Sequence, residues 1–291
     1  MRDQAVSGTL LTDDGATIAF YDTEGAGPPI LLANGLGGPL RAWKPQIDYL
    51  GDRYRIISWD YRGLYNSPLP PDQPPRLDVP THARDLARLA THLGVERAAC
   101  IGWSMGVPVL LETYEKRPDL ISHLVLLNGT FGKPLSNSTL PLVNKVLPRI
   151  VRGARRFESV GTGLVKRASD QPETVLWLKR LGLVSSTLDE DLFRQLADDF
   201  SGLDLGLYLD MLRALGEYDA ARLLETVRVP TLAIVGDRDL FTPKDLAMRM
   251  ARKIPGGELL LVRGASHYAA LEYPELVNLR IEKFFREHGF T

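Results

Sequence analysis

The sequence lacks the features that mark secreted, membrane-spanning or disulfide-stapled proteins. Its 291 residues include one cysteine, Cys100, so the chain cannot form an internal disulfide. The N-terminus has no apolar core of a secretory signal, and no window approaches about eighteen uninterrupted apolar residues, the length of a membrane span. We therefore expect a cytoplasmic protein without a transmembrane segment.

An excess of one charge is also absent. The 35 Lys and Arg residues oppose 36 Asp and Glu residues, for a net charge of −1, so we expect no nucleic acid partner. No His, Cys, Asp or Glu residues have the close spacing of a metal-binding motif, and we expect neither a metal nor a cofactor. Nothing in the sequence specifies an oligomeric state.

What the sequence contains is an alternation of apolar runs with helical patterns, and an apolar content of 44% that supports a large core. A hairpin is expected first, because two short runs flank an Asp-Gly turn signal at residues 13–16. Expected strands are 8–12, 17–22, 28–34, 54–60, 98–104, 122–129, 231–237 and 257–264, and the intervening helices include 43–50, 81–93 and 107–117. This order predicts an α/β protein with a mostly parallel, eight-stranded sheet flanked by helices.

The alternation stops after the sixth expected strand and resumes at Pro230. We therefore predict a core domain of residues 1–132 and 230–291 and a helical cap of residues 133–229. Residues 133–180 contain ten basic and three acidic residues, whereas residues 188–225 contain ten acidic and three basic ones. Solvated helix faces that attract each other are the expected explanation. Contact of the basic residues with an anionic substrate, a carrier protein or a lipid surface is the alternative.

The motif Gly-x-Ser-x-Gly occurs once, as "GWSMG" at residues 102–106. In this motif the serine lies on a tight strand-to-helix turn that exposes its hydroxyl above the sheet. The match is weak by itself, but a buried strand precedes it and a helical pattern follows it, in the required order. We therefore interpret Ser104 as a nucleophile rather than an ordinary turn serine.

A serine nucleophile needs a basic histidine, which in turn needs a carboxylate. Asp237 and Asp239 follow one late strand, and His267 follows the next, in a Gly-Ala-Ser-His turn. The other histidines fall on expected helices or a strand, which suits packing or exposure: His82, His92, His123 and His288. His267 is therefore the expected base.

The order Ser, Asp, His, with "GDRDLFTP" and "GASHYAALEYPE" around the last two, resembles the α/β-hydrolase superfamily, in its capped esterase, lactonase and haloperoxidase-like branch. The resemblance covers essentially the whole chain and is weakest in the insertion. It implies Asp239 as the acid, since this residue lies three positions after Gly236 and four before Pro243. Asp237 is then a loop carboxylate.

The resemblance also implies an oxyanion hole, in which two backbone N–H groups face the charged oxygen of a tetrahedral intermediate. The expected donors are Met105, after the nucleophile, and Leu36, in the loop after the third strand. Asn34, Gly35 and Trp103 are expected to support this loop, and Asn34 stands where the family usually has histidine. Phosphate or dinucleotide binding is disfavoured, because "NGLGG" lacks the spacing of both motifs.

A second family segment, D-x-R-G-x-G-x-S, corresponds to "DYRGLYNS". Asp60 and Arg62 are expected to tie this loop together. Tyr65 departs from the pattern, since it stands where a second glycine is usual.

These residues predict a carboxylesterase-like serine hydrolase that cleaves an ester, thioester or lactone of a medium-to-large apolar substrate through an acyl-enzyme on Ser104. The same triad also serves C–C bond hydrolysis, elimination and perhydrolysis, and receptor-like binding proteins share the fold. Haloalkane dehalogenase and epoxide hydrolase chemistry is disfavoured, because those relatives carry aspartate at the position of Ser104.

Overall fold

The computed structural model describes residues 6–70, 74–132, 178–180 and 183–290. In these ranges the strands are β1 (Gly8–Leu11), β2 (Thr17–Asp22), β3 (Pro29–Ala33), β4 (Arg55–Trp59), β5 (Ala98–Trp103), β6 (Ile121–Leu127), β7 (Thr231–Gly236) and β8 (Glu258–Val262). The helices are η1 (Leu40–Trp43), α1 (Lys44–Leu50), α2 (Val79–His92), α3 (Gly106–Lys116), α8 (Glu190–Ser201), α9 (Leu205–Glu217), η3 (Leu224–Thr226), α10 (Lys244–Lys253), α11 (Ala269–Glu272) and α12 (Pro274–Glu287).

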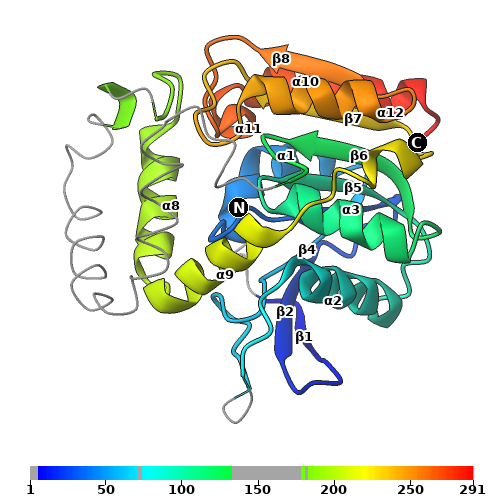
Figure 1. Cartoon of the computed structure of the whole chain (residues 1–291), viewed down its shortest axis with the longest axis vertical. Coiled ribbons are helices and arrows are strands. Elements are labelled where there is room, and N and C mark those ends of the chain that lie inside the picture. The colour runs from blue at the N-terminus through cyan, green and yellow to red at the C-terminus, as the bar shows by residue number, and fades with distance from the viewer. Residues whose placement is uncertain (1–5, 71–73, 133–177, 181–182, 291) are drawn as a thin grey trace.

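The strands form one sheet in the order β1-β2-β4-β3-β5-β6-β7-β8 (Figure 1). β1 and β2 pair as the expected antiparallel hairpin, β2 is antiparallel to β4, and all further neighbours are parallel. The predicted mostly parallel, eight-stranded sheet with flanking helices is confirmed. The chain order reverses at β3, which lies between β4 and β5, and open sheets of this kind bind ligands beyond the carboxyl ends of their strands at such a point.

Helices cover both faces of the sheet because successive strand residues point to opposite sides. In β3, Leu31 belongs to one apolar cluster, whereas Ile30 and Leu32 belong to the other. The cluster around Leu31 contains side chains of α2, α3 and α10, and the opposite cluster contains side chains of α1, α11 and α12. Figure 1 shows α2 and α3 side by side along the strands.

Two α-helices of the predicted insertion, α8 and α9, and the short helix η3 lie in the described ranges. In Figure 1, α8 stands beyond the end of the sheet to which the arrows of β6 and β8 point. Its apolar side packs on that end through a small cluster of Val184, Leu188, Phe193, Leu196, Ala42 and Leu271, with Trp103 against it. The division into a core and a cap of residues 133–229 stays a prediction, since residues 133–177 and 181–182 lie outside the described ranges.

Asp189 and Asp204 begin these two helices as N-caps. The Asp189 carboxylate accepts hydrogen bonds from the N–H groups of Asp191 and Leu192, and Asp204 accepts one from Leu207. Part of the acidic excess in this segment is therefore explained by capping. Lys179, from the basic part, pairs with Glu190 at 2.7 Å, as expected for halves that attract each other.

The loop after β4 is held by buried charge pairs. Arg62 binds both oxygens of Asp85 at 2.6 and 2.7 Å and also binds Asp14 at 2.8 Å. The hydrogen bond from Arg62 is the main reason that the pKa of Asp14 lies well below its ordinary value. Asp60 is buried separately and accepts hydrogen bonds from Tyr21 and Asn66. Asp60 and Arg62 thus tie the loop to different elements.

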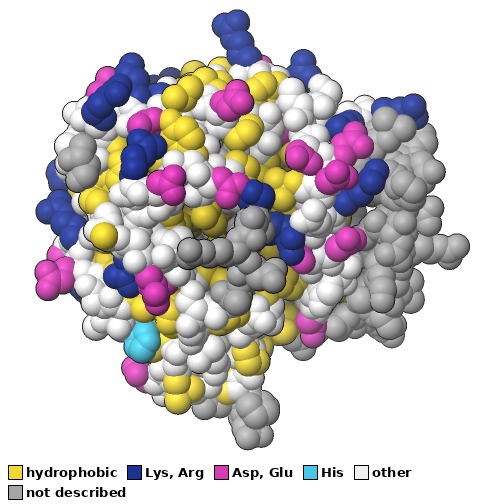
Figure 2. Space-filling view, turned by 180° about the vertical axis from the view of Figure 1, so that it is seen from behind, with side chains coloured by type: hydrophobic (Ala, Val, Ile, Leu, Met, Phe, Trp, Pro, Cys, Tyr) yellow, Lys and Arg dark blue, Asp and Glu magenta, His cyan; other side chains and the backbone are white. Residues whose placement is uncertain are grey.

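Charges of both signs lie next to one another on the face shown in Figure 2, where they surround small areas of exposed apolar side chains. Such a mixture is what the net charge of −1 leads one to expect. Within the described ranges, no helix combines the length and apolar character needed to cross a membrane.

From the burial of His82 we predict that the free energy of unfolding falls in acid. This side chain of α2 is fully buried against the ring of Tyr61, and burial, with the nearby charge of Arg62, lowers its pKa to about 3. The unfolded chain therefore takes up a proton near the ordinary histidine pKa of about 6.5, and stability is lost as the pH falls below that value.

We expect His82→Phe, which keeps a ring against Tyr61, to remove this part of the pH dependence. Between pH values of about 6 and 4, the wild-type free energy of unfolding should fall by about 1.4 kcal/mol per pH unit more than that of the variant. Urea unfolding at several pH values measures this. His92→Gln, at the exposed end of the same helix, is the control and should keep the wild-type slope. Parallel curves for wild type and His82→Phe would contradict the prediction.

Candidate active site

Ser104 lies on the turn between β5 and α3, and its backbone φ is 53°, in the left-handed region that non-glycine residues rarely adopt. The two motif glycines permit this turn. A Cβ on Gly106 would lie 2.2 Å from the carbonyl oxygen of Ala33 in β3, and one on Gly102 would lie 2.8 Å from the backbone of Gly106. The local sequence therefore allows a strained turn that projects the serine beyond the strand end.

A chain of hydrogen bonds joins Ser104 to two residues from later strands. His267, between β8 and α11, places Nε2 3.0 Å from the Oγ of Ser104. Its Nδ1 lies 2.9 Å from the Oδ2 of Asp239, which follows β7. With the proton on Nδ1, the imidazole donates to Asp239 and can accept the serine proton at Nε2.

The Asp239 carboxylate is buried and receives several further hydrogen bonds. Its Oδ1 accepts from the N–H groups of Phe241 and Thr242, and its Oδ2 accepts from the Thr242 hydroxyl and the Asn128 amide. Burial raises the pKa of Asp239, but the charge of His267 and the hydrogen bonds from His267 and Thr242 outweigh it and hold the pKa below its ordinary value. A carboxylate held ionised in this way can orient an imidazole and stabilise its charged form.

The alternative carboxylate, Asp237, faces a different group. It accepts a hydrogen bond from the N–H of Gly264 at 2.7 Å and so stabilises the turn before His267. The structure thus brings Ser104, Asp239 and His267 together and gives Asp237 a separate contact.

The glycine loop after β3 forms a tight turn beside Ser104. The N–H of Gly38 donates to the carbonyl of Gly35 at 2.9 Å, and Gly37 has a φ of 70°. The Trp103 ring lies under this turn, since a Cβ on Gly35 or Gly38 would come within 2.9 Å of it. Because the Trp103 indole also donates to the carbonyl of His267 at 3.0 Å, one side chain contacts both the glycine turn and the histidine loop.

The backbone N–H groups of Leu36 and Met105 have no protein acceptor among the described residues. Met105 directly follows Ser104 at the start of α3, and Leu36 lies in the glycine turn. Both expected donors are therefore unused by the fold, which is the condition for donating to a ligand oxygen.

Asn34 is buried, and both its side chain and its carbonyl make structural hydrogen bonds. Its amide donates to the carbonyl of Trp59 at 2.8 Å, its side-chain oxygen accepts from the Trp43 indole at 2.5 Å, and its carbonyl accepts from the Tyr61 hydroxyl at 2.9 Å. The asparagine at this position thus joins the end of β3 to η1 and to the loop after β4.

Aromatic side chains lie next to His267 and next to the glycine turn. The Phe241 and Tyr268 rings lie 5.3 and 5.9 Å from the His267 ring, and Phe193 of α8 packs on Tyr268 at 5.5 Å. On the other side, the rings of Phe200 and Tyr208 come close to Gly37. The surroundings of Ser104 are therefore largely apolar.

Sequence reasoning missed Asn128 and Glu272. Asn128 has a φ of 42° directly after β6 and binds Asp239, and a polar residue in the run "LLNG" at a strand end was the available signal. The buried Glu272 accepts hydrogen bonds from the N–H and hydroxyl of Ser266 and from the N–H of Ser185. It thereby joins the segment before α8 to the residue preceding His267, a contact that no local pattern indicates.

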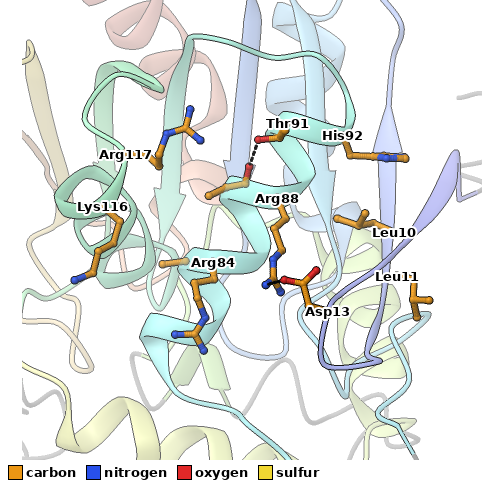
Figure 3. A pocket seen from close by; sticks show the side chains of 11 residues that line it. Leu10, Leu11, Asp13, Arg84, Arg88, Thr91, His92, Lys116 and Arg117 are labelled. Carbon is orange, nitrogen blue, oxygen red and sulfur yellow. Dashed lines mark hydrogen bonds and ion pairs between the residues drawn. The ribbon is translucent and has the colours of Figure 1, made fainter.

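A hollow of about 530 Å³ lies elsewhere, between the β1–β2 hairpin, α2 and the end of α3 (Figure 3). Its basic side chains have ordinary explanations, since Arg88 pairs with Asp13, Arg117 pairs with Asp119, and Lys116 lies at a helix C-terminus where cations are favoured. In the part of the chain that is described, no group of three or more His, Cys, Asp or Glu side chains could hold a metal ion.

A mostly parallel sheet of eight strands, with a serine, a histidine and an aspartate gathered beyond its strand ends, defines an α/β hydrolase fold. The family model for this fold, described as alpha/beta hydrolase fold, matches residues 28–274, and the chain belongs to this family.

The chain is similar to proteins that carry several hydrolase names. A putative carbamate hydrolase RutD of Azorhizobium caulinodans is 27% identical over 259 residues, which cover 89% of this chain and 91% of that protein. The structure of a thermophilic esterase from Thermogutta terrifontis has a TM-score of 0.72 and 25% identity, with 97% of both chains covered. An enol-lactonase from Burkholderia xenovorans LB400 has a TM-score of 0.77 and 22% identity, with 96% of this chain and 100% of that chain covered.

From the hydrogen bonds of Glu272 we predict that this residue stabilises the contact between the segment before α8 and the loop that carries His267. The two carboxylate oxygens of Glu272 together accept three hydrogen bonds. In Glu272→Gln an NH₂ group replaces one of these oxygens and cannot accept. We expect the free energy of unfolding to fall by about 1–3 kcal/mol, because a buried donor loses its acceptor. Faster amide exchange at Ser185 and Ser266, measured by NMR or mass spectrometry, should accompany this loss. Glu275→Gln removes the same charge from an exposed site of α12 and should change neither quantity.

Proposed function

We propose that the protein is a serine hydrolase that cleaves a carboxylic ester, thioester or lactone through an acyl-enzyme on Ser104. The observation that supports this most is the continuous hydrogen-bonded chain from Asp239 through His267 to Ser104. A serine hydroxyl is a weak nucleophile without a base. Here the His267 imidazole is hydrogen-bonded to Ser104, and the buried Asp239 carboxylate orients that imidazole.

In the proposed reaction, His267 accepts the Ser104 proton as the serine oxygen attacks the substrate carbonyl. The negative charge that develops on the carbonyl oxygen is stabilised by the N–H groups of Leu36 and Met105, each contributing about 3–4 kcal/mol. The intermediate collapses to an acyl ester on Ser104, and His267 gives its proton to the leaving group. Water then loses a proton to His267 and attacks the acyl ester, and the bond from the acyl carbon to the Ser104 oxygen breaks as His267 returns the proton to that oxygen, which releases the acid.

The proposed substrate is a small molecule with a medium-to-large apolar part. The aromatic rings near His267 and Gly37 support this, because they offer apolar contact area and few charged groups. α8 and α9 would form part of the wall as a cap.

A carbamate is the second candidate substrate class, since relatives that align over most of this chain carry the name putative carbamate hydrolase. The same serine attack on a carbamate forms a carbamoyl-enzyme. Resonance with nitrogen makes the carbonyl of a carbamoyl-enzyme less reactive than that of an acyl-enzyme, so water should release the product of a carbamate more slowly than that of an ester.

The Ser104→Ala variant tests the proposal directly. We expect a fluorophosphonate probe to label the wild type on Ser104 and to leave the variant unlabelled, and hydrolysis of p-nitrophenyl esters, lactones, acyl thioesters and aryl carbamates to be lost in parallel. Ser201→Ala, at the C-terminal end of α8, where the hydroxyl donates to the carbonyl of Asp198, serves as the control and should label normally. Labelling that persists in Ser104→Ala would exclude the proposed nucleophile. Turnover confined to acetyl esters would exclude the large apolar substrate.

The two neighbouring aspartates provide a matched test of the acid. Asp239→Asn should lower kcat by about 10³- to 10⁴-fold, because an amide cannot stabilise the imidazolium and favours the wrong tautomer. Asp237→Asn changes the same group two positions earlier, where the contact is with Gly264, and kcat should stay within a few-fold of wild type. Steady-state kinetics on the best ester decides. Equal losses in the two variants would argue against Asp239 as the orienting carboxylate.

A further inference from the structure

The glycine turn of residues 35–38 depends on side chains from other elements for its position. Trp103 lies under Gly35 and Gly38, and the rings of Phe200 and Tyr208 lie close to Gly37. These contacts are apolar. They prevent the turn from moving toward the rings, but they do not fix the orientation of its peptide groups. Within the described residues, one side-chain hydrogen bond reaches the turn: the Tyr65 hydroxyl donates to the carbonyl oxygen of Gly37 at 2.6 Å.

Tyr65 makes this contact from a strained backbone conformation. Its φ is 48°, in the left-handed region, at the position where the related family pattern has glycine. The strain explains why glycine suits this position. It also means that the tyrosine side chain is held here by its surroundings rather than by its backbone preference.

The loop that carries Tyr65 is a rigid support. Asn66 donates its N–H to the buried Asp60, and the Ser67 hydroxyl donates to the carbonyl of Asp60. The ion pair of Arg62 with Asp85 anchors the same loop to α2. A hydrogen bond from such a support restrains its acceptor more than one from a mobile loop would.

The Tyr65 hydroxyl is a donor throughout the ordinary pH range. Burial is the main reason that its pKa is raised, and the carboxylates of Asp199 and Asp60 raise it further. The bond to Gly37 therefore persists at any pH at which a His267 base would operate.

We propose that Tyr65 is a positioning residue for the oxyanion hole, because its hydroxyl fixes the Gly37 carbonyl and with it the turn that presents the Leu36 N–H. This rests on the proposed hydrolase function. An N–H group that is already oriented toward the oxygen on which charge develops does not have to reorient during the reaction. If this orientation is no longer fixed, binding of the transition state weakens more than binding of the substrate.

The Tyr65→Phe variant removes the hydroxyl and keeps the ring and the backbone strain. We expect kcat on a p-nitrophenyl ester and the rate of fluorophosphonate labelling to fall about tenfold, with KM within about twofold, since the donor is loosened rather than deleted. Tyr21→Phe is the matched control. It deletes a tyrosine hydroxyl that binds Asp60 in the same loop and so tests whether any loss of loop structure lowers the rate. It should lower the melting temperature at least as much and leave kcat unchanged.

A second variant separates stability from positioning. Tyr65→Gly relieves the left-handed strain but removes the ring that packs on the apolar core, so its melting temperature should lie below that of Tyr65→Phe, while the loss of kcat and labelling rate should be at least as large, because both variants lack the hydroxyl. Wild-type kcat in either Tyr65 variant, or an equal loss of kcat in Tyr21→Phe, would overturn the positioning role and leave the serine hydrolase proposal intact. Failure of that proposal shows separately, as labelling that persists in Ser104→Ala.

Discussion

The close contact between the turn after β5 and the end of β3 is the constraint on which the site depends. The backbone of Gly106 lies so close to the carbonyl of Ala33 that only a glycine fits there, and Ser104, two residues earlier, has a left-handed backbone. The same contact places Ser104 beside the loop that leaves β3, at the point where the strand order reverses. Ser104 and the glycine turn are therefore neighbours because of sheet topology, although about 70 residues separate them along the chain.

Buried polar groups around this point are paired across elements. The Asp239 carboxylate binds His267, Thr242 and Asn128, and Glu272 binds Ser266 and Ser185. A buried carboxylate without such partners would lose much of its charge, so each pairing specifies one arrangement of the loops that contribute to it. Rigid loops at the carboxyl end of the sheet follow from this, and rigid loops are what a preorganised site requires.

Helix α8 contacts the elements around the candidate site through residues whose own sequence pattern does not indicate these partners. The helical periodicity of "DEDLFRQLADDF", residues 189–200, predicts a helix, and α8 covers nearly the same residues with Phe193 and Leu196 buried on one face. The pattern contains no information on which surface the face covers. The structure places it on Trp103, Leu271 and Tyr268, next to the histidine loop.

The sequence by itself determined the class of fold and named the candidate residues of the site. Alternating strand and helix patterns specify a parallel sheet, and the strand-turn-helix order around Ser104, with His267 after a late strand, specifies which side chains could meet, because carboxyl ends of parallel strands share one edge. Only the tertiary structure decided the contacts made over long separations. Glu272 joins Ser185 to Ser266, the Asn34 amide is used within the core, and Tyr65 reaches Gly37. Periodicity reports which face of an element is buried, whereas these partners depend on how loops from distant elements pack together.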